Sequence, residues 1–90
     1  MPSSVVRVVL DVLKPRELPL PRLAAGICEH SGASQVTADI VEVDLKTETV
    51  KLTVEGEALD LDLLYRTLEE YGCAVRSTDS ITVKYLPEDH

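Results

Sequence analysis

Two segments far apart in the chain carry alternating side chains that fit each other as neighbouring antiparallel strands. Residues 5–12 read Val-Val-Arg-Val-Val-Leu-Asp-Val, and residues 50–55 read Val-Lys-Leu-Thr-Val-Glu. One register gives three apolar pairs on one face and two pairs of opposite charge on the other: Val12 with Val50, Leu10 with Leu52, Val8 with Val54, Asp11 with Lys51 and Arg7 with Glu55. Because successive side chains of a strand point to opposite faces, this register predicts a sheet with one buried face and one charged face.

The rest of the chain predicts two helices and two further strands in an ordered pattern. Apolar residues at helical spacing indicate helices over 20–31 and 61–71, and alternation indicates strands over 36–45 and 73–79. With the first pair of strands placed at 5–13 and 50–56, the order is strand, helix, strand, strand, helix, strand. That order is the split βαβ arrangement of ferredoxin-like folds. We therefore expect one α+β ferredoxin-like domain over residues 1–90.

The usual sheet order of this fold is 4-1-3-2, with both helices on the apolar face, and it agrees with the predicted pairing of 5–12 with 50–55. Residues 81–85 either extend the last strand or form a short fifth strand after Ser80. Between the second and third strands we expect a loop of four residues, 46–49, with a two-residue turn as the alternative. In that arrangement Val41, Val43 and Leu45 face the core.

Composition narrows the classes of function. The 90 residues include no Phe or Trp, so the core must be aliphatic and thin, and self-association would bury more apolar surface. We expect the edge formed by residues 81–85 to contribute to subunit contacts. The formal net charge of −7 disfavours nucleic acid and anionic membranes as partners.

Nothing in the sequence predicts passage through or insertion into a membrane. No apolar run approaches the roughly 20 residues of a transmembrane helix, and the N-terminus lacks the pattern of a signal peptide. We therefore expect a cytoplasmic protein with reduced Cys28 and Cys73, a disulfide between them being the alternative.

Carboxylates concentrate around the second and third predicted strands. Hard cations such as calcium need several oxygen ligands at once, and the candidate metal ligands are Asp11, Glu42 and Asp44. The alternative is a solvated sheet face on which the acids pair with Arg7 and Lys51, since opposite charges across strands stabilise a sheet by about 0.2–1 kcal/mol per pair.

Other chemistry has little support. Cys28, His30 and Cys73 contain the elements of a zinc site or a thiol–imidazole pair, but helix residues two apart do not share a face. The positions of His30 and His90 make a Ser–His–acid triad improbable. Phosphate-binding glycine motifs are absent, and the predicted open face lacks aromatic residues for base stacking. The sequence thus predicts no catalytic residue and no cofactor-binding residue.

Three stretches of the chain, taken together, resemble one known family. They are Val-Leu-Asp-Val-Leu-Lys-Pro at 9–15, Glu-Val-Asp at 42–44 followed by Lys-Leu-Thr-Val-Glu-Gly at 51–56, and Arg-Ser-Thr-Asp at 76–79. The chain is similar over nearly its whole length to the archaeal family called domain of unknown function 211. The resemblance implies a ferredoxin-like fold, self-association into ring-like oligomers, an unassigned biochemical role and a bound divalent cation such as calcium.

The chain departs from the family pattern at two positions. Arg16 and Arg76 stand where family members commonly have His, which puts in doubt any role that requires imidazole there. The residues that match the pattern are Asp11, Lys14, Asp44, Glu48, Glu55, Gly56 and Asp79.

Three functional hypotheses follow from the sequence. The first is a non-enzymatic homo-oligomeric module, with a regulatory site for a divalent cation or a small molecule. The second is a regulatory domain that senses amino acids or other small molecules, although Lys-Pro-Arg-Glu replaces the glycine-rich turn common in such domains at 14–17. The third is an enzyme whose site is shared between subunits and uses Cys28 or Cys73 with Arg76.

Overall fold

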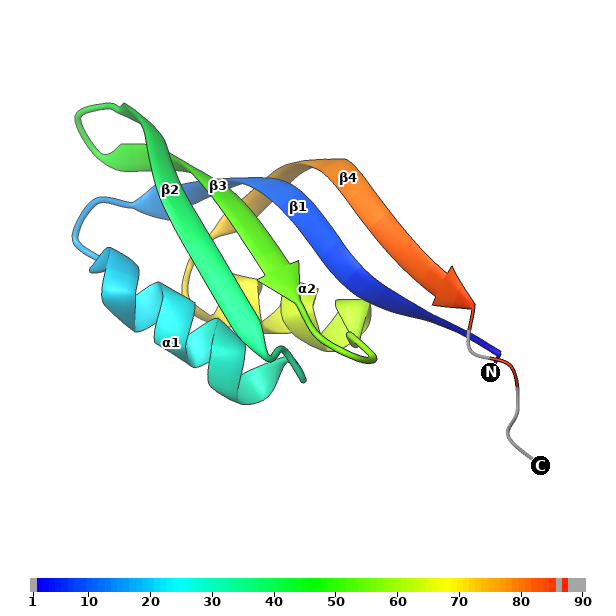
Figure 1. Cartoon of the computed structure of the whole chain (residues 1–90). Helices are drawn as coiled ribbons and strands as arrows, with labels where there is room; N and C mark the ends of the chain where they lie inside the picture. Colours follow the sequence, from blue (N-terminus) through cyan, green and yellow to red (C-terminus); the bar gives the residue numbers. More distant parts are fainter. Residues whose placement is uncertain (1, 86, 88–90) are drawn as a thin grey trace.

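The computed structural model describes residues 2–85 and 87, and it has the predicted order of strands and helices (Figure 1). The elements are β1 (Ser3–Pro15), α1 (Leu20–His30), β2 (Gln35–Val43), β3 (Thr47–Glu55), α2 (Leu61–Glu70) and β4 (Ala74–Tyr85). The four strands form one antiparallel sheet in the order β2-β3-β1-β4. The chain therefore has the ferredoxin-like α+β fold.

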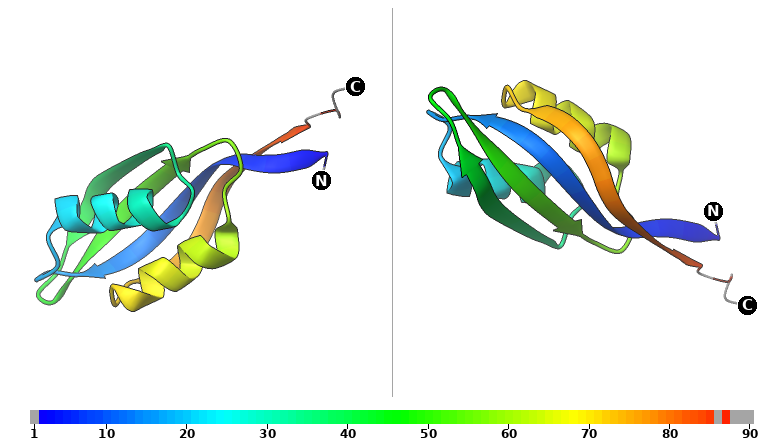
Figure 2. Two further views of the ribbon diagram at one scale, coloured as in Figure 1. Left: turned by 90° about the horizontal axis from the view of Figure 1, so that it is seen from below. Right: turned by 90° about the horizontal axis from the view of Figure 1, so that it is seen from above.

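The predicted register between β1 and β3 is confirmed at every pair. Val12 lies opposite Val50 and Asp11 opposite Lys51, and the ladder continues beyond the predicted ends to Pro15 and Thr47. Both helices cover the same face of the sheet, as the two views of Figure 2 show. The core between sheet and helices consists of Val8, Leu10, Val12, Leu23, Ile27, Val50, Leu52, Val54, Leu59, Leu64, Leu68 and Cys73.

Local signals explain the limits of α2. The Asp60 side chain accepts a hydrogen bond from the backbone N–H of Leu63 at 3.0 Å, so it caps the free amides of the first turn. Gly72 follows the helix with φ at +78°, a conformation that glycine adopts without steric cost. These signals placed α2 within one residue of its observed end.

A close contact joins the two helical segments. Gly26 is buried in α1, and the ring of Tyr71 packs directly against it from the end of α2. A methyl group at Gly26 would clash first with the Tyr71 hydroxyl oxygen, and it would lie 2.5 Å from Cζ and 2.7 Å from Cε2 of that ring. Only a residue without a side chain lets the ring approach α1 so closely.

The expected orientation of β2 is wrong at Val41. Val36, Ala38 and Ile40 lie opposite Val54, Leu52 and Val50 of the core, so regular alternation points Val41 to the open face, where it is 65% exposed. A bulge at Val41 then places Val43 opposite Glu48, but Val43 is 54% exposed and does not pack in the core.

The loop between β2 and β3 also differs from the prediction. It spans residues 44–46 and not 46–49, because β3 begins at Thr47, and it is closed by a hydrogen bond from Asp44 N–H to Thr47 O at 2.8 Å. Leu45, expected to face the core, lies in this turn and is 92% exposed. The Leu45 side chain therefore lies in the turn, outside the part of the sheet that the helices cover.

The final strand is long and continuous. Residues 81–85 extend β4, so the chain has no separate fifth strand in the part that the structure describes. The ends of β1 and β4 run together past the helices as a two-stranded ribbon (Figure 1), and the molecule measures 55 × 22 × 17 Å. Bulges at Val6, Arg76 and Asp79 interrupt the pairing of β1 with β4. Such bulges bend strands and redirect side chains.

Candidate functional site

The three predicted metal ligands lie on different parts of the sheet. Asp11 is on β1 opposite Lys51, Glu42 follows the bulge of β2 opposite Thr49, and Asp44 is in the turn after β2. Among residues 2–85 and 87, no three His, Cys, Asp or Glu side chains gather in an arrangement that could hold a metal ion. One copy of the chain therefore does not bring Asp11, Glu42 and Asp44 together as a ligand set.

The charged face of the sheet has the predicted backbone register without the predicted ion pairs. Within the described part of the chain, the one side-chain ion pair shorter than 4 Å joins Lys14 to Glu48. Neither Arg7 with Glu55 nor Asp11 with Lys51 reaches that distance, and Glu55 instead accepts a hydrogen bond from Gln35 Nε2 at 3.1 Å. Exposed side chains gain little from such pairing and lose side-chain entropy by it, which explains why adjacency does not lead to contact.

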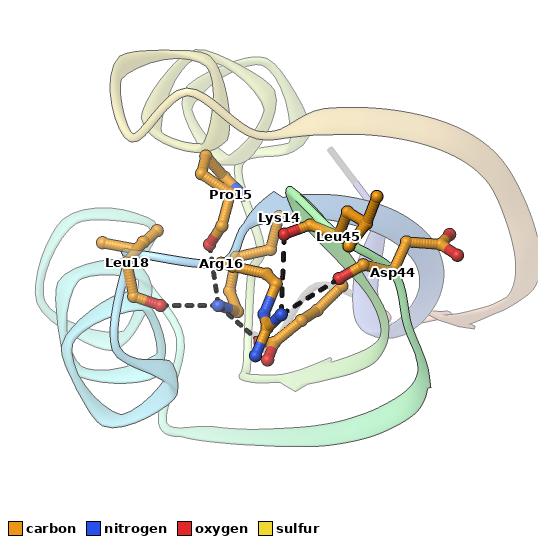
Figure 3. Close-up of polar contacts among 7 residues, drawn as sticks. Lys14, Pro15, Arg16, Leu18, Asp44 and Leu45 are labelled. Carbon is orange, nitrogen blue, oxygen red and sulfur yellow. Dashed lines mark hydrogen bonds and ion pairs between the residues drawn. The ribbon is translucent and has the colours of Figure 1, made fainter.

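The Lys14 cluster, made of Lys14, Glu48 and two backbone carbonyls, is buried at the end of β1 (Figure 3). Lys14 is 1% exposed, and its Nζ lies 2.6 Å from Glu48 Oε1. The same Nζ donates to the carbonyl oxygens of Pro15 at 2.9 Å and Leu18 at 2.5 Å. All three ammonium protons thus have acceptors, which is the condition for burying a charged lysine.

Arg16 connects the β1–α1 loop to the turn between β2 and β3. Its backbone N–H donates to Lys46 O at 3.0 Å, and its guanidinium Nη1 lies 3.4 Å from Asp44 O and 3.5 Å from Leu45 O (Figure 3). Arg16 thus contacts the turn only through backbone oxygens. Lys14 and Arg16 together fix the two loops at this end of the sheet against each other.

Sequence reasoning missed the Lys14 cluster, although the signal was present. Lys14 and Glu48 continue the β1–β3 register by one further pair on the apolar face, beyond Val12 and Val50. Extending the ladder past Lys14-Pro15 would have placed the two opposite charges side by side on the buried face. That step was not taken because the first strand was predicted to end at residue 13, and Glu48 was placed in the loop 46–49.

A shallow depression of about 240 Å³, here called the open-face hollow, lies on the side of the sheet away from the helices. Residues from all four strands line it: Leu10, Asp11, Val41, Thr49, Lys51 and Asp79. Val41 and Asp79 are bulge residues, one on each edge strand. Ser77 Oγ donates to Asp79 Oδ1 at 2.7 Å, which orients that carboxylate.

The two cysteines are free, and among the described residues neither forms a hydrogen bond with His30. Cys28 is half-buried, with Sγ 3.8 Å from the carbonyl oxygen of Ala33, whereas His30 is exposed at the end of α1. Burial raises the pKa of the Cys73 thiol, and the nearby Lys14 ammonium opposes that shift. A thiol with a raised pKa is a poor nucleophile at neutral pH, so the geometry gives little support to catalysis by Cys73 with Arg76.

No helix in the part of the chain that the structure describes has the length and apolar character needed to cross a membrane.

Comparison with known proteins identifies a family of this architecture. The model of DUF211, described as "Uncharacterized ArCR", matches residues 6–86. The chain is also 34% identical over 79 residues to "Uncharacterized protein MJ0319" of the archaeon Methanocaldococcus jannaschii, a match that covers 88% of this chain and 81% of that protein. The chain belongs to the DUF211 family, which has no assigned biochemical function.

Proposed function

We propose that the protein is a non-enzymatic module that assembles with copies of itself through the two edges of its sheet. The observation that carries this proposal is β4, an edge strand of 12 residues of which every one is exposed. The backbone N–H and C=O groups along an uncovered edge are available to pair with another strand. A second copy of the chain presents a matching edge at β2.

Large apolar side chains are exposed on both edge strands. On β4 the exposed ones are Val75, Ile81, Val83 and Tyr85, and along β2 and its turn they are Ile40, Val41, Val43 and Leu45. Contiguous apolar surface of this kind marks contact sites in soluble proteins. Burying it would also compensate for a core without Phe or Trp.

The charges of the two edges favour contact between unlike edges. The β2 edge and its turn carry Asp39, Glu42 and Asp44 with only Lys46 of opposite sign, whereas β4 carries Arg76 and Lys84 with only Asp79 of opposite sign. Pairing β2 of one copy with β4 of the next is therefore electrostatically better than pairing two β2 edges. Repeated contacts between unlike surfaces generate closed rings or open filaments.

Two variants with charges on opposite edges test this arrangement. Val43→Lys places a positive charge on the β2 edge, and Val83→Glu places a negative charge on β4, so each introduces a like charge against its partner edge. By sedimentation at micromolar concentration we expect assembly of the wild type, monomers of each variant alone, and restored assembly when the two are mixed. In the mixture the unchanged β4 edge of Val43→Lys can pair with the unchanged β2 edge of Val83→Glu.

Ala25 provides the matched control, because it is exposed on α1 and belongs to neither edge strand. Ala25→Lys and Ala25→Glu should assemble like the wild type. If only one of the edge variants loses assembly, the contact joins two copies of the same edge. A wild-type protein that sediments as a monomer contradicts the whole proposal.

The regulatory part of this proposal is a divalent cation, with calcium as the example, held by Asp11, Glu42 and Asp44. Since one copy does not gather these acids, ligands must come together across copies. We expect calorimetry of the assembled protein to show calcium binding that weakens in Asp11→Asn and Asp44→Asn and in monomeric Val43→Lys. Absence of binding heat at millimolar calcium would refute the cation site and leave the assembly proposal standing.

A further inference from the structure

The open-face hollow holds charged groups of both signs that do not neutralise one another. Asp11 and Lys51 face each other across β1 and β3, and Asp79 reaches the hollow from β4. Within the described residues, no ion pair shorter than 4 Å involves any of these three side chains. The hollow thus presents two carboxylates and one ammonium group around a space open to solvent.

Two of the lining residues, Val41 and Asp79, lie at bulges of the edge strands. Asp79 is two residues after Ser77, which lies opposite Asp11, so Asp79 shares the open face with Asp11, and the bulge leaves it without a partner on β1. The hydrogen bond from Ser77 Oγ restrains the Asp79 carboxylate. Bulges are frequent beside binding sites.

The shape and the other lining groups limit the class of ligand. A volume of about 240 Å³ is smaller than the roughly 300–1,000 Å³ typical of pockets for drug-sized molecules. The Val41 side chain provides an apolar wall, and the Thr49 hydroxyl can donate or accept a hydrogen bond. The ligand must therefore be small, partly aliphatic and charged at more than one point.

We propose that the open-face hollow binds a free basic amino acid of the lysine or ornithine class. The ligand's α-carboxylate pairs with the Lys51 ammonium on β3, and its two ammonium groups pair with Asp11 on β1 and Asp79 on β4, so its methylene chain crosses the open face of β1. A ligand with a net charge of +1 neutralises the site, where two carboxylates and one ammonium sum to −1. Charge-assisted hydrogen bonds of this kind are about twice as strong as neutral ones. Most of the lining belongs to the central strands β1 and β3, and Val41 and Asp79 come from the edge strands through which copies are proposed to assemble.

The test is a titration of the full, isotopically labelled chain with L-lysine, followed by two-dimensional amide NMR. We expect saturable shifts in the millimolar range or below, concentrated at the residues that line the hollow. Asp79→Asn and Lys51→Met should each weaken binding by about tenfold, which corresponds to roughly 1.4 kcal/mol. The same titration in monomeric Val43→Lys shows whether binding is independent of assembly.

Asp39→Asn is the matched control, because Asp39 lies opposite Lys51 on β2 but does not line the hollow. It should bind L-lysine like the wild type. Equal weakening in Asp39→Asn and Asp79→Asn would mean general attraction to an acidic protein and would overturn the proposal. So would absence of saturable shifts, or equally tight binding of cadaverine, which has both ammonium groups but no carboxylate for Lys51.

Discussion

Replacement of Glu48 by alanine is expected to lower the free energy of unfolding by about 3 kcal/mol. The substitution removes Glu48, the anionic partner of the Lys14 ammonium group, and Lys14 is 1% exposed. Removing one member of a buried ion pair typically costs 3–5 kcal/mol, and we take the lower end because Glu48 is itself 19% exposed. Urea denaturation monitored by circular dichroism measures the change.

The double variant Lys14→Met/Glu48→Ala shows whether the loss of stability in Glu48→Ala comes from an unpaired charge or from lost packing. Lys14→Met keeps an unbranched apolar side chain at the buried position and removes the ammonium group. We expect Lys14→Met/Glu48→Ala to be more stable than Glu48→Ala alone, because no charge is then left in the interior. A double variant that is less stable by the sum of the single effects would show that the ion pair is not the origin of the cost.

Substitution of Gly26 by alanine is expected to destabilise the protein by about 1–2 kcal/mol, although alanine is the better helix former. Overpacking a filled site costs roughly 1–3 kcal/mol. The higher helix propensity of alanine offsets about 0.5–1 kcal/mol of that cost. The cost comes from the Tyr71 ring, whose Cζ would lie 2.5 Å from the added methyl group. Thermal and urea denaturation of the variant measure the sum of the two effects.

The sign of the Gly26 effect should reverse when Tyr71 is removed. In a Tyr71→Ala background, Gly26→Ala is expected to stabilise by about 0.5–1 kcal/mol, since only the helix propensity remains. In a Tyr71→Phe background it should still destabilise, because Cζ and Cε2 of the ring are retained. Destabilisation in the Tyr71→Ala background would mean that another neighbour, and not the ring, excludes the methyl group.

Much of the fold could be predicted because several independent signals agree. The β1–β3 register satisfies an apolar face and a charged face at once, and a shift by one residue would exchange the two faces. Asp60 and Gly72 mark the ends of α2 through local hydrogen bonding and backbone conformation. The order of the elements then leaves few possible sheet topologies.

The parts that could not be predicted depend on bulges and on solvent-exposed side chains. A bulge has no strong sequence signature, yet bulges at Val41 and Asp79 shift the pairing of both edge strands with their neighbours. Opposite charges on neighbouring strands were predicted to pair, but Arg7 and Glu55 do not. Register follows from burial, whereas the positions of exposed side chains do not.

The contacts of Arg16 have a consequence for which substitutions this chain can accept. Arg16 contacts the turn at 44–46 through three backbone oxygens and through none of its side chains. Any sequence that keeps the same chain path supplies the same acceptors, so substitutions at Leu45 and Lys46 leave these bonds intact. An insertion or deletion in the turn displaces all three acceptors together. The tip of the molecule can therefore diversify in chemistry while its length stays under selection.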